Sequence, residues 1–285
     1  MAPRFGTIRA YGSEAMANFS LREYAPFAWL LAANCLFLFL ASNLGSIWGM
    51  ASAGRVAYLV GGDGATRNPG FFVSLPTIFA YTETAIYTVL GAIVLPLALV
   101  GMIAHDEPSL KSAEARAARV RGAILPTFLG LLACLALSIL WQWAVGNWIV
   151  PVFRLFLGGG FNSILATWAV STLVGYVFVA LVYHVPIFAI RTGAGPLPAF
   201  TGGVRQGVPL LWGTMLYILF FSIPAIVVQA VVQLFPTLIV VRLRPELILV
   251  LLFVYAALTS LAAYLSYSAA VRLHLAETAE TEEGA

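Results

Sequence analysis

TAIYTVLGAIVLPLALVGMIA, residues 84–104, decides the fold, because this long apolar stretch contains no Asp, Glu, Lys or Arg. A helix needs about 20 mainly apolar residues to cross the roughly 30 Å of hydrocarbon in a bilayer. Five further uncharged stretches meet the same condition. They are residues 26–48, 123–145, 163–190, 208–234 and 247–271. The sequence therefore predicts an all-α, polytopic transmembrane bundle of six spans.

The composition supports a membrane protein. Of the 285 residues, 61% are hydrophobic and 9% are charged, whereas soluble domains carry about 25% charged residues. No polar stretch is long enough to bury a core of its own. We therefore expect a single membrane domain over residues 1–276, followed by an acidic tail over residues 277–285 that is disordered.

The basic residues predict the orientation, because basic loops stay in the cytoplasm. With the N-terminus inside, ten basic residues fall on the cytoplasmic side and five on the other. The ten are Arg4, Arg9, Arg22, Lys111, Arg116, Arg119, Arg121, Arg191, Arg205 and Arg272, and the five are Arg55, Arg67, Arg154, Arg242 and Arg244. This distribution predicts that both termini are cytoplasmic.

The choice of residues also indicates a source. Lys111 is the only lysine among the 15 basic residues, and Ala, Leu and Gly are abundant. This composition is typical of a high-GC bacterium, which predicts a multi-pass protein of the bacterial cytoplasmic (inner) membrane. Cys35 and Cys134 both fall in apolar spans, where cysteine acts as a small packing residue.

Three connecting segments have distinctive patterns. SLKSAEARAARVRG, residues 109–122, places Ala, Glu and Arg at helical spacing and predicts a cytoplasmic extension of the third span. NPGFFVSLPTIFAY (68–81) and NWIVPVFRLFLGGGFN (147–162) are too apolar for ordinary loops and contain Pro and Gly. We expect these two segments to lie along the outer membrane interface or to re-enter it.

His184, in YHVPIFAI (183–190), is the only histidine within a predicted span. It lies about six residues, or roughly 9 Å, from the predicted cytoplasmic end of that span. Pro186 removes a backbone hydrogen bond and frees a carbonyl nearby. We expect His184 to form a structural hydrogen bond to such a carbonyl. Because His105 and His274 fall in cytoplasmic segments, the sequence predicts no haem, no metal site and no other cofactor.

The other polar candidates lie in the spans or at their edges. Gln142, Gln229 and Gln233 either hydrogen-bond between helices or line a polar path. Glu83, at the outer start of the second span, is either a capping carboxylate or an outer gate paired with Arg154. The residue pattern alone does not decide between these alternatives.

Enzymatic function is disfavoured. Intramembrane proteases and proton-coupled carriers use ionisable side chains within or at the edge of the membrane. Only Glu83, Arg154 and Glu246 lie near an edge, and no two of them form a recognisable catalytic pair. A rhomboid-type serine protease would need a Gly-x-Ser-Gly context, which Ser222 and Ser260 lack. We therefore predict no catalytic residues.

The second half of the chain carries a resemblance. RTGAGPLPAFTGGVRQGVPLLWGTMLYILFFSIP (191–224) joins a small-residue stretch to a span, and LTSLAAYLSYSAAVRLHL (258–275) closes the chain with Tyr264 and Tyr267. This arrangement resembles the six-span membrane domain found with bacterial glycerophosphoryl diester phosphodiesterases and in YciC-type membrane proteins. The resemblance covers about 80 residues, and the chain lacks the usual Ser-Trp pair and a phosphodiesterase domain. It implies a non-catalytic membrane module tied to lipid or envelope processes.

Two functional classes follow. The first is an accessory or structural module of a membrane complex or of envelope and lipid processes. The alternative is the permease subunit of a multi-component transporter driven by a separate ATPase, with residues 109–122 and 193–207 as coupling helices. In either class we expect membrane lipids and other membrane or peripheral subunits as partners. The net charge of +3 reflects topology, and no nucleic-acid partner is predicted.

Overall fold

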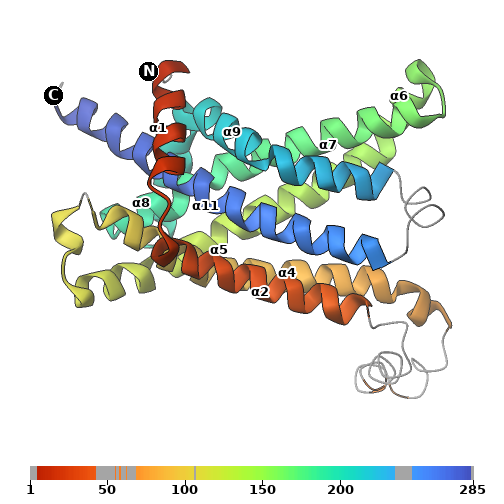
Figure 1. Ribbon diagram of the computed structural model, residues 1–285, viewed down its shortest axis with the longest axis horizontal. Helices are drawn as coiled ribbons and strands as arrows, with labels where there is room; N and C mark the ends of the chain where they lie inside the picture. The colour runs from red at the N-terminus through yellow and green to blue at the C-terminus, as the bar shows by residue number, and fades with distance from the viewer. Residues whose placement is uncertain are drawn as a thin grey trace.

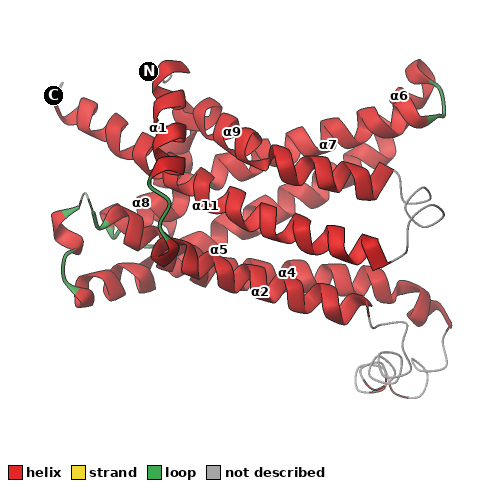
Figure 2. Ribbon diagram, in the orientation of Figure 1, coloured by secondary structure: helices red, strands yellow, loops and turns green. Residues whose placement is uncertain are grey.

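The computed structural model describes residues 5–42, 55, 58, 62, 69–105, 107–234 and 246–283, and helices are the only regular elements in these ranges (Figure 2). In chain order the elements are α1 (Phe5–Ala17), α2 (Leu21–Ser42), α4 (Pro69–Ile103), the 3-10 turn η1 (Pro108–Leu110), α5 (Ala113–Ala144), the π-helical turn η2 (Val145–Ile149), α6 (Val150–Leu157), α7 (Phe161–Val182), α8 (His184–Thr192), α9 (Pro196–Leu234) and α11 (Glu246–Glu283). The first predicted span continues beyond Ser42 into residues 43–48, which lie outside the described part.

Six helical segments of the described chain are long and apolar enough to cross a membrane. They are Leu21–Leu40, Thr84–Ile103, Ala113–Leu157, Phe161–Thr192, Pro196–Val232 and Leu247–Ala276. The prediction of an all-α bundle with six such helices is therefore confirmed. The long helices run along the long axis of the molecule, and both chain ends lie at the same end of the bundle (Figure 1).

The segment 147–162 differs from the predicted interfacial connection. Helix continues from α5 through η2 into α6 and ends only at Gly158, whose φ of 76° is a conformation that glycine adopts readily. The ring of Pro151 would clash with the carbonyl of residue 147 in a regular α-helix. In the wider π-turn the N–H of Val150 bonds the carbonyl of Val145, which accommodates the proline.

Residues 69–81 of the segment 68–81 also belong to a long helix, since α4 begins at Pro69, a favoured first helical residue. At the other end of the chain, α11 runs to Glu283 and includes most of the tail for which the sequence predicts disorder. The alternation of Ala and Glu there favours helix, because both residues have high helix propensity.

The fourth predicted span consists of two helices. α7 ends at Val182 and α8 begins at His184, with Tyr183 between them donating its N–H to the carbonyl of Ala180 at 3.4 Å. Pro186 explains the break, because it cannot donate to the carbonyl of residue 182 and its ring excludes that carbonyl. α8 is buried on most sides, with Val185, Ile187 and Ile190 all 0% exposed.

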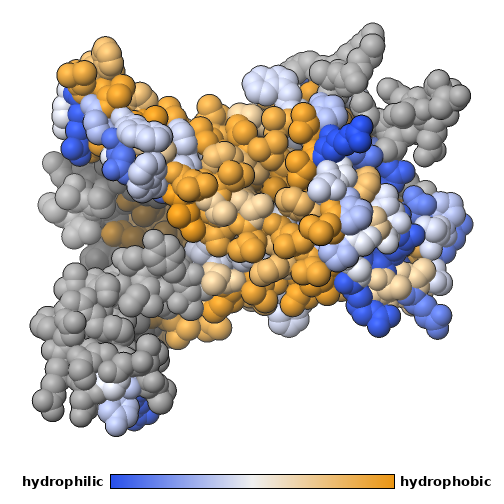
Figure 3. Space-filling view, turned by 180° about the vertical axis from the view of Figure 1, so that it is seen from behind, coloured by the Kyte–Doolittle hydropathy of each residue, from blue (hydrophilic) through white to orange (hydrophobic). Residues whose placement is uncertain are grey.

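The packed core occupies the half of the bundle that carries the termini. There α4 buries Leu99 and Ile103, and α11 buries Tyr264 and Leu273. In the other half, residues 131–144 of α5 and 164–179 of α7 are half-buried or exposed. An apolar band covers the middle of the molecule, and hydrophilic residues gather at the packed end (Figure 3). This pattern suits a bilayer, where exposed apolar side chains face lipid.

α1 was not predicted from the sequence. It packs across α9 and α11 at the packed end, with Ile8 and Ala15 buried against Leu210, Tyr217 and Leu273. The signal that would have revealed it is the spacing of Ile8, Tyr11, Gly12 and Ala15, which places all four on one helical face. Gly12 is the small residue of this face, because a Cβ there would lie 3.5 Å from the ring of Tyr217.

Candidate functional site

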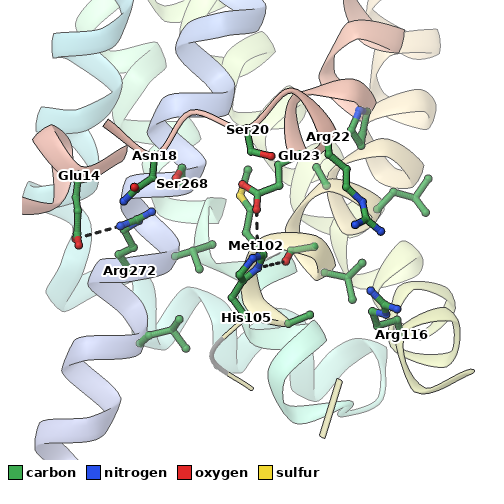
Figure 4. A pocket seen from close by; sticks show the side chains of 18 of the residues that line it. Glu14, Asn18, Ser20, Arg22, Glu23, Met102, His105, Arg116, Ser268 and Arg272 are labelled. Atoms are coloured by element: carbon green, nitrogen blue, oxygen red, sulfur yellow. Dashed lines mark hydrogen bonds and ion pairs between the residues drawn. The ribbon is translucent and has the colours of Figure 1, made fainter. Parts of the chain in front are cut away.

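A cleft of about 1050 Å³ lies at the packed end of the bundle. Its walls come from α1, the first turns of α2 and α5, and the last turns of α4 and α11. Figure 4 shows Glu14, Arg22, Glu23, His105, Arg116 and Arg272 around it. The cleft thus combines charged groups from four helices, α1, α2, α5 and α11, with His105, which follows the end of α4.

The junction between α1 and α2 forms one wall and is anchored by Tyr264 of α11. The Tyr264 hydroxyl accepts a hydrogen bond from the backbone N–H of Ser20 at 3.0 Å and donates to Oε2 of Glu23 at 3.4 Å. Its buried ring makes edge-to-face contacts with Phe19 and Tyr24. A buried aromatic side chain therefore fixes both the turn and the direction of the Glu23 carboxylate.

Glu23 also faces the end of α4. Its Oε1 lies 3.9 Å from Nδ1 of His105, and the same nitrogen lies 3.2 Å from the carbonyl of Gly101. The His105 side chain is 75% exposed and that of Glu23 only 19%. An exposed pair of this kind contributes little to stability. The exposure of His105 makes it a solvent-accessible polar group at the rim of the cleft.

On the opposite wall, Arg272 of α11 pairs with Glu14 of α1 at 3.1 Å. This ion pair joins the surface helix to the bundle, and it neutralises both charges. The guanidinium groups of Arg22 and Arg116, which also line the cleft, form no hydrogen bond or ion pair with any described residue. The cleft therefore presents two guanidinium groups that have no partner from the described chain.

His184 lies outside this cleft, in the core beneath it. Its ring is 0% exposed, and Nε2 lies 2.8 Å from Oγ1 of Thr214 on α9. The observed partner is therefore a side-chain hydroxyl, whereas the sequence predicts a carbonyl freed by Pro186. The contact between His184 and Thr214 therefore joins α8 to α9.

His274, which the sequence assigns to a cytoplasmic segment, is buried in the packed end of the bundle. It is 1% exposed and its ring stacks on that of His184, with centroids 5.5 Å apart and an interplanar angle of 20°. The reason is that α11 continues helically past residue 271, so His274 stays in the packed interior. Within the described residues no group of three or more His, Cys, Asp or Glu is placed to hold a metal ion.

The remaining predicted site residues whose side chains the structure describes are Gln142, Gln229 and Arg154, and none of them lines the cleft. Gln142 is exposed on α5, Gln229 is half-buried on α9, and Arg154 is exposed on α6. The side chains of Gln233 and Glu83 lie outside the described part.

Arg119, one of the basic residues that predict the cytoplasmic side, contacts the end of another helix. Its guanidinium lies against Gly193, the residue that caps α8 with a φ of 62°. A cation at this position is favoured by the partial negative charge at a helix C-terminus. The arginines of α5 therefore divide, with Arg119 contacting the end of α8 and Arg116 facing the cleft.

Comparison of the chain with protein-family models, with curated proteins and with solved structures gave no match. The fold defines the class of protein as an α-helical bundle with six helices that are long and apolar enough to cross a membrane.

Proposed function

We propose that the chain is a non-catalytic, multi-pass module of a bacterial cytoplasmic membrane, accessory to a membrane complex or to envelope and lipid processes. The observation that carries this proposal is the cleft at the packed end, which is lined by charged side chains of α1, α2, α5 and α11 and by apolar residues such as Leu97. Such a site suits binding of amphiphilic or headgroup-level partners at the surface of a bilayer.

The distribution of charge supports a cytoplasmic position for the cleft. Arg22, Arg116 and Arg272 line the cleft, and Arg191 pairs with Glu107, two residues after His105 of its lining. At the far end, α6 carries Arg154. Because basic segments remain in the cytoplasm, both termini and the cleft face that compartment in the proposed arrangement.

The sequence resemblance points to the same role. The six-span domain that accompanies glycerophosphoryl diester phosphodiesterases, and that occurs in YciC-type proteins, carries no catalytic residues of its own. A chain similar to that domain in residues 191–275 would act through its binding surfaces. The partners in this proposal are membrane lipids and other membrane or peripheral subunits.

The permease alternative receives less support. The two segments considered as coupling helices are the opening turns of the long helices α5 and α9, instead of separate helices. Gln142 is exposed on the bundle surface, where it would not line a path shared with Gln229. We therefore treat a transport complex as the alternative outcome of the test.

Native mass spectrometry of the chain, extracted in mild detergent from its own membrane, tests the proposed function. The expected result is the chain with retained lipid and without a stoichiometric nucleotide-hydrolysing subunit. A co-purifying ATPase in fixed ratio would contradict the proposal in favour of a permease subunit. A haem or metal mass would contradict it as well, since it would show a cofactor-dependent role.

A further inference from the structure

Two unpartnered arginines give the cleft a specific chemistry. Arg22 lies in the first turn of α2 and Arg116 in the first turns of α5, and both line the cleft. Figure 4 shows them on the same side of it. Two guanidinium groups that line the same cleft attract an anion, and planar guanidinium groups match the oxygens of a phosphate especially well.

The carboxylates of the cleft do not satisfy these arginines. Glu14 is 3.1 Å from Arg272, and the two oxygens of Glu23 face His105 and the Tyr264 hydroxyl. Among the described residues, the lining therefore holds three arginines against two glutamates. The excess positive charge is concentrated at Arg22 and Arg116, so an external anion is the group that completes the site.

The walls near these arginines are apolar. Pro26, one turn after Arg22, and Leu97 of α4 both line the cleft. Leu97 is 47% exposed, so its side chain also belongs to the outer apolar surface of the bundle. A ligand bound at the arginines can therefore extend along Leu97 into the apolar band. This continuity favours an amphiphile over a free anion.

The size of the cleft agrees with such a ligand. Its volume of about 1050 Å³ is at the upper end of the roughly 300–1,000 Å³ typical of small-molecule sites. This volume holds a polar head group together with the first carbons of an acyl chain. Ser268 and Asn18, which also line the cleft, add hydrogen-bonding groups for the polar part of a head group.

We infer that the cleft is a phospholipid-binding site, in which Arg22 and Arg116 hold the phosphate diester and Pro26 and Leu97 contact the acyl chain. The inference rests on the proposed function, because a lipid reaches the cleft only when the bundle spans a bilayer. A free phosphate and the phosphate diester of a lipid would both present oxyanions to the two arginines. The apolar walls assign the site to the lipid.

The test uses the purified full chain, stripped of lipid and titrated with dioleoylphosphatidylglycerol while native mass spectrometry counts bound lipids. The double variant Arg22→Gln/Arg116→Gln should raise the Kd at least tenfold, because each lost charge-assisted hydrogen bond is worth about 1.5–3 kcal/mol. The matched control is Arg121→Gln/Arg205→Gln, which removes two exposed arginines outside the cleft. The control should leave the Kd unchanged.

Two further arms identify the ligand. Dioleoylglycerol, which has the acyl chains but no phosphate, should fail to compete, and inorganic phosphate should compete only weakly. Leu97→Ser keeps both arginines and should weaken phosphatidylglycerol binding several-fold. Because Leu97 is exposed, this variant retains its fold even if the arginine variants do not.

Three results would overturn the inference. They are equal weakening by the control pair, full competition by inorganic phosphate, and full competition by dioleoylglycerol. The first would indicate general surface charge, the second a free-phosphate site, and the third an apolar site. None of these results bears on the subunit composition of the extracted protein, which tests the proposed function. The lipid-binding inference can therefore be refuted while the proposed function stands.

Discussion

Tyr264→Ala should lower the free energy of unfolding by about 3–5 kcal/mol, the range for truncating a large buried aromatic side chain. Tyr264 is 0% exposed, and its ring lies 5.2 Å from that of Phe19 and 5.8 Å from that of Phe27. Its removal leaves a cavity between α2 and α11 and releases the α1–α2 junction. Unfolding monitored in mixed detergent micelles measures the loss.

The hydroxyl and the ring of Tyr264 can be separated. Tyr264→Phe retains the ring and loses the two hydrogen bonds to Ser20 and Glu23, so it should cost about 1–3 kcal/mol. Tyr255→Phe, a half-buried tyrosine of the same helix outside the junction, is the matched control and should be neutral. Equal losses in Tyr264→Phe and Tyr264→Ala would contradict the packing role of the ring.

Gly203→Ala should destabilise the protein by about 3 kcal/mol, the upper end of the usual cost of overpacking. A Cβ at Gly203 would lie 2.5 Å from Cα and 3.0 Å from N of Val185. These are backbone atoms, so rotation of a side chain cannot relieve the overlap, and α8 must move away from α9. The helix-propensity gain of about 0.5–1 kcal/mol from Gly to Ala is too small to offset this.

Gly175→Ala is the control for Gly203→Ala. Gly175 lies in α7, and a Cβ there meets nothing within 4 Å. This variant should be neutral or slightly stabilising under the same unfolding conditions. A neutral Gly203→Ala would contradict the close approach of α8 and α9, and with it the position of the His184–Thr214 contact.

The six long apolar helices of the described chain were predictable because a bilayer imposes a simple requirement on the sequence. A helix that crosses hydrocarbon must be apolar over about 20 residues, and this property is local. The helix ends were less predictable. Pro151 suggests a break, yet the π-turn before it accommodates the ring, and whether such a turn forms depends on the neighbouring helices.

The cleft could not be predicted from the sequence in the same way. Arg22 and Arg116 belong to different helices. In the sequence, each of them indicates only the cytoplasmic side of the membrane. Only packing shows that Arg272 is neutralised by Glu14 while these two are left without a partner. Similarly, Pro186 near His184 indicated a structural role, but the partner Thr214 lies on another helix.

The proposed role requires the cleft to open to the cytoplasm, and cysteine labelling tests this most directly. After replacement of Cys35 and Cys134 by alanine, single cysteines are introduced as Asn18→Cys in the cleft and Asn162→Cys at the start of α7. Both positions are exposed and lie at opposite ends of the bundle. In intact spheroplasts a membrane-impermeant maleimide should label only Asn162→Cys, and Asn18→Cys should react only after the membrane is opened. Labelling of Asn18→Cys from outside would contradict a cytoplasmic cleft.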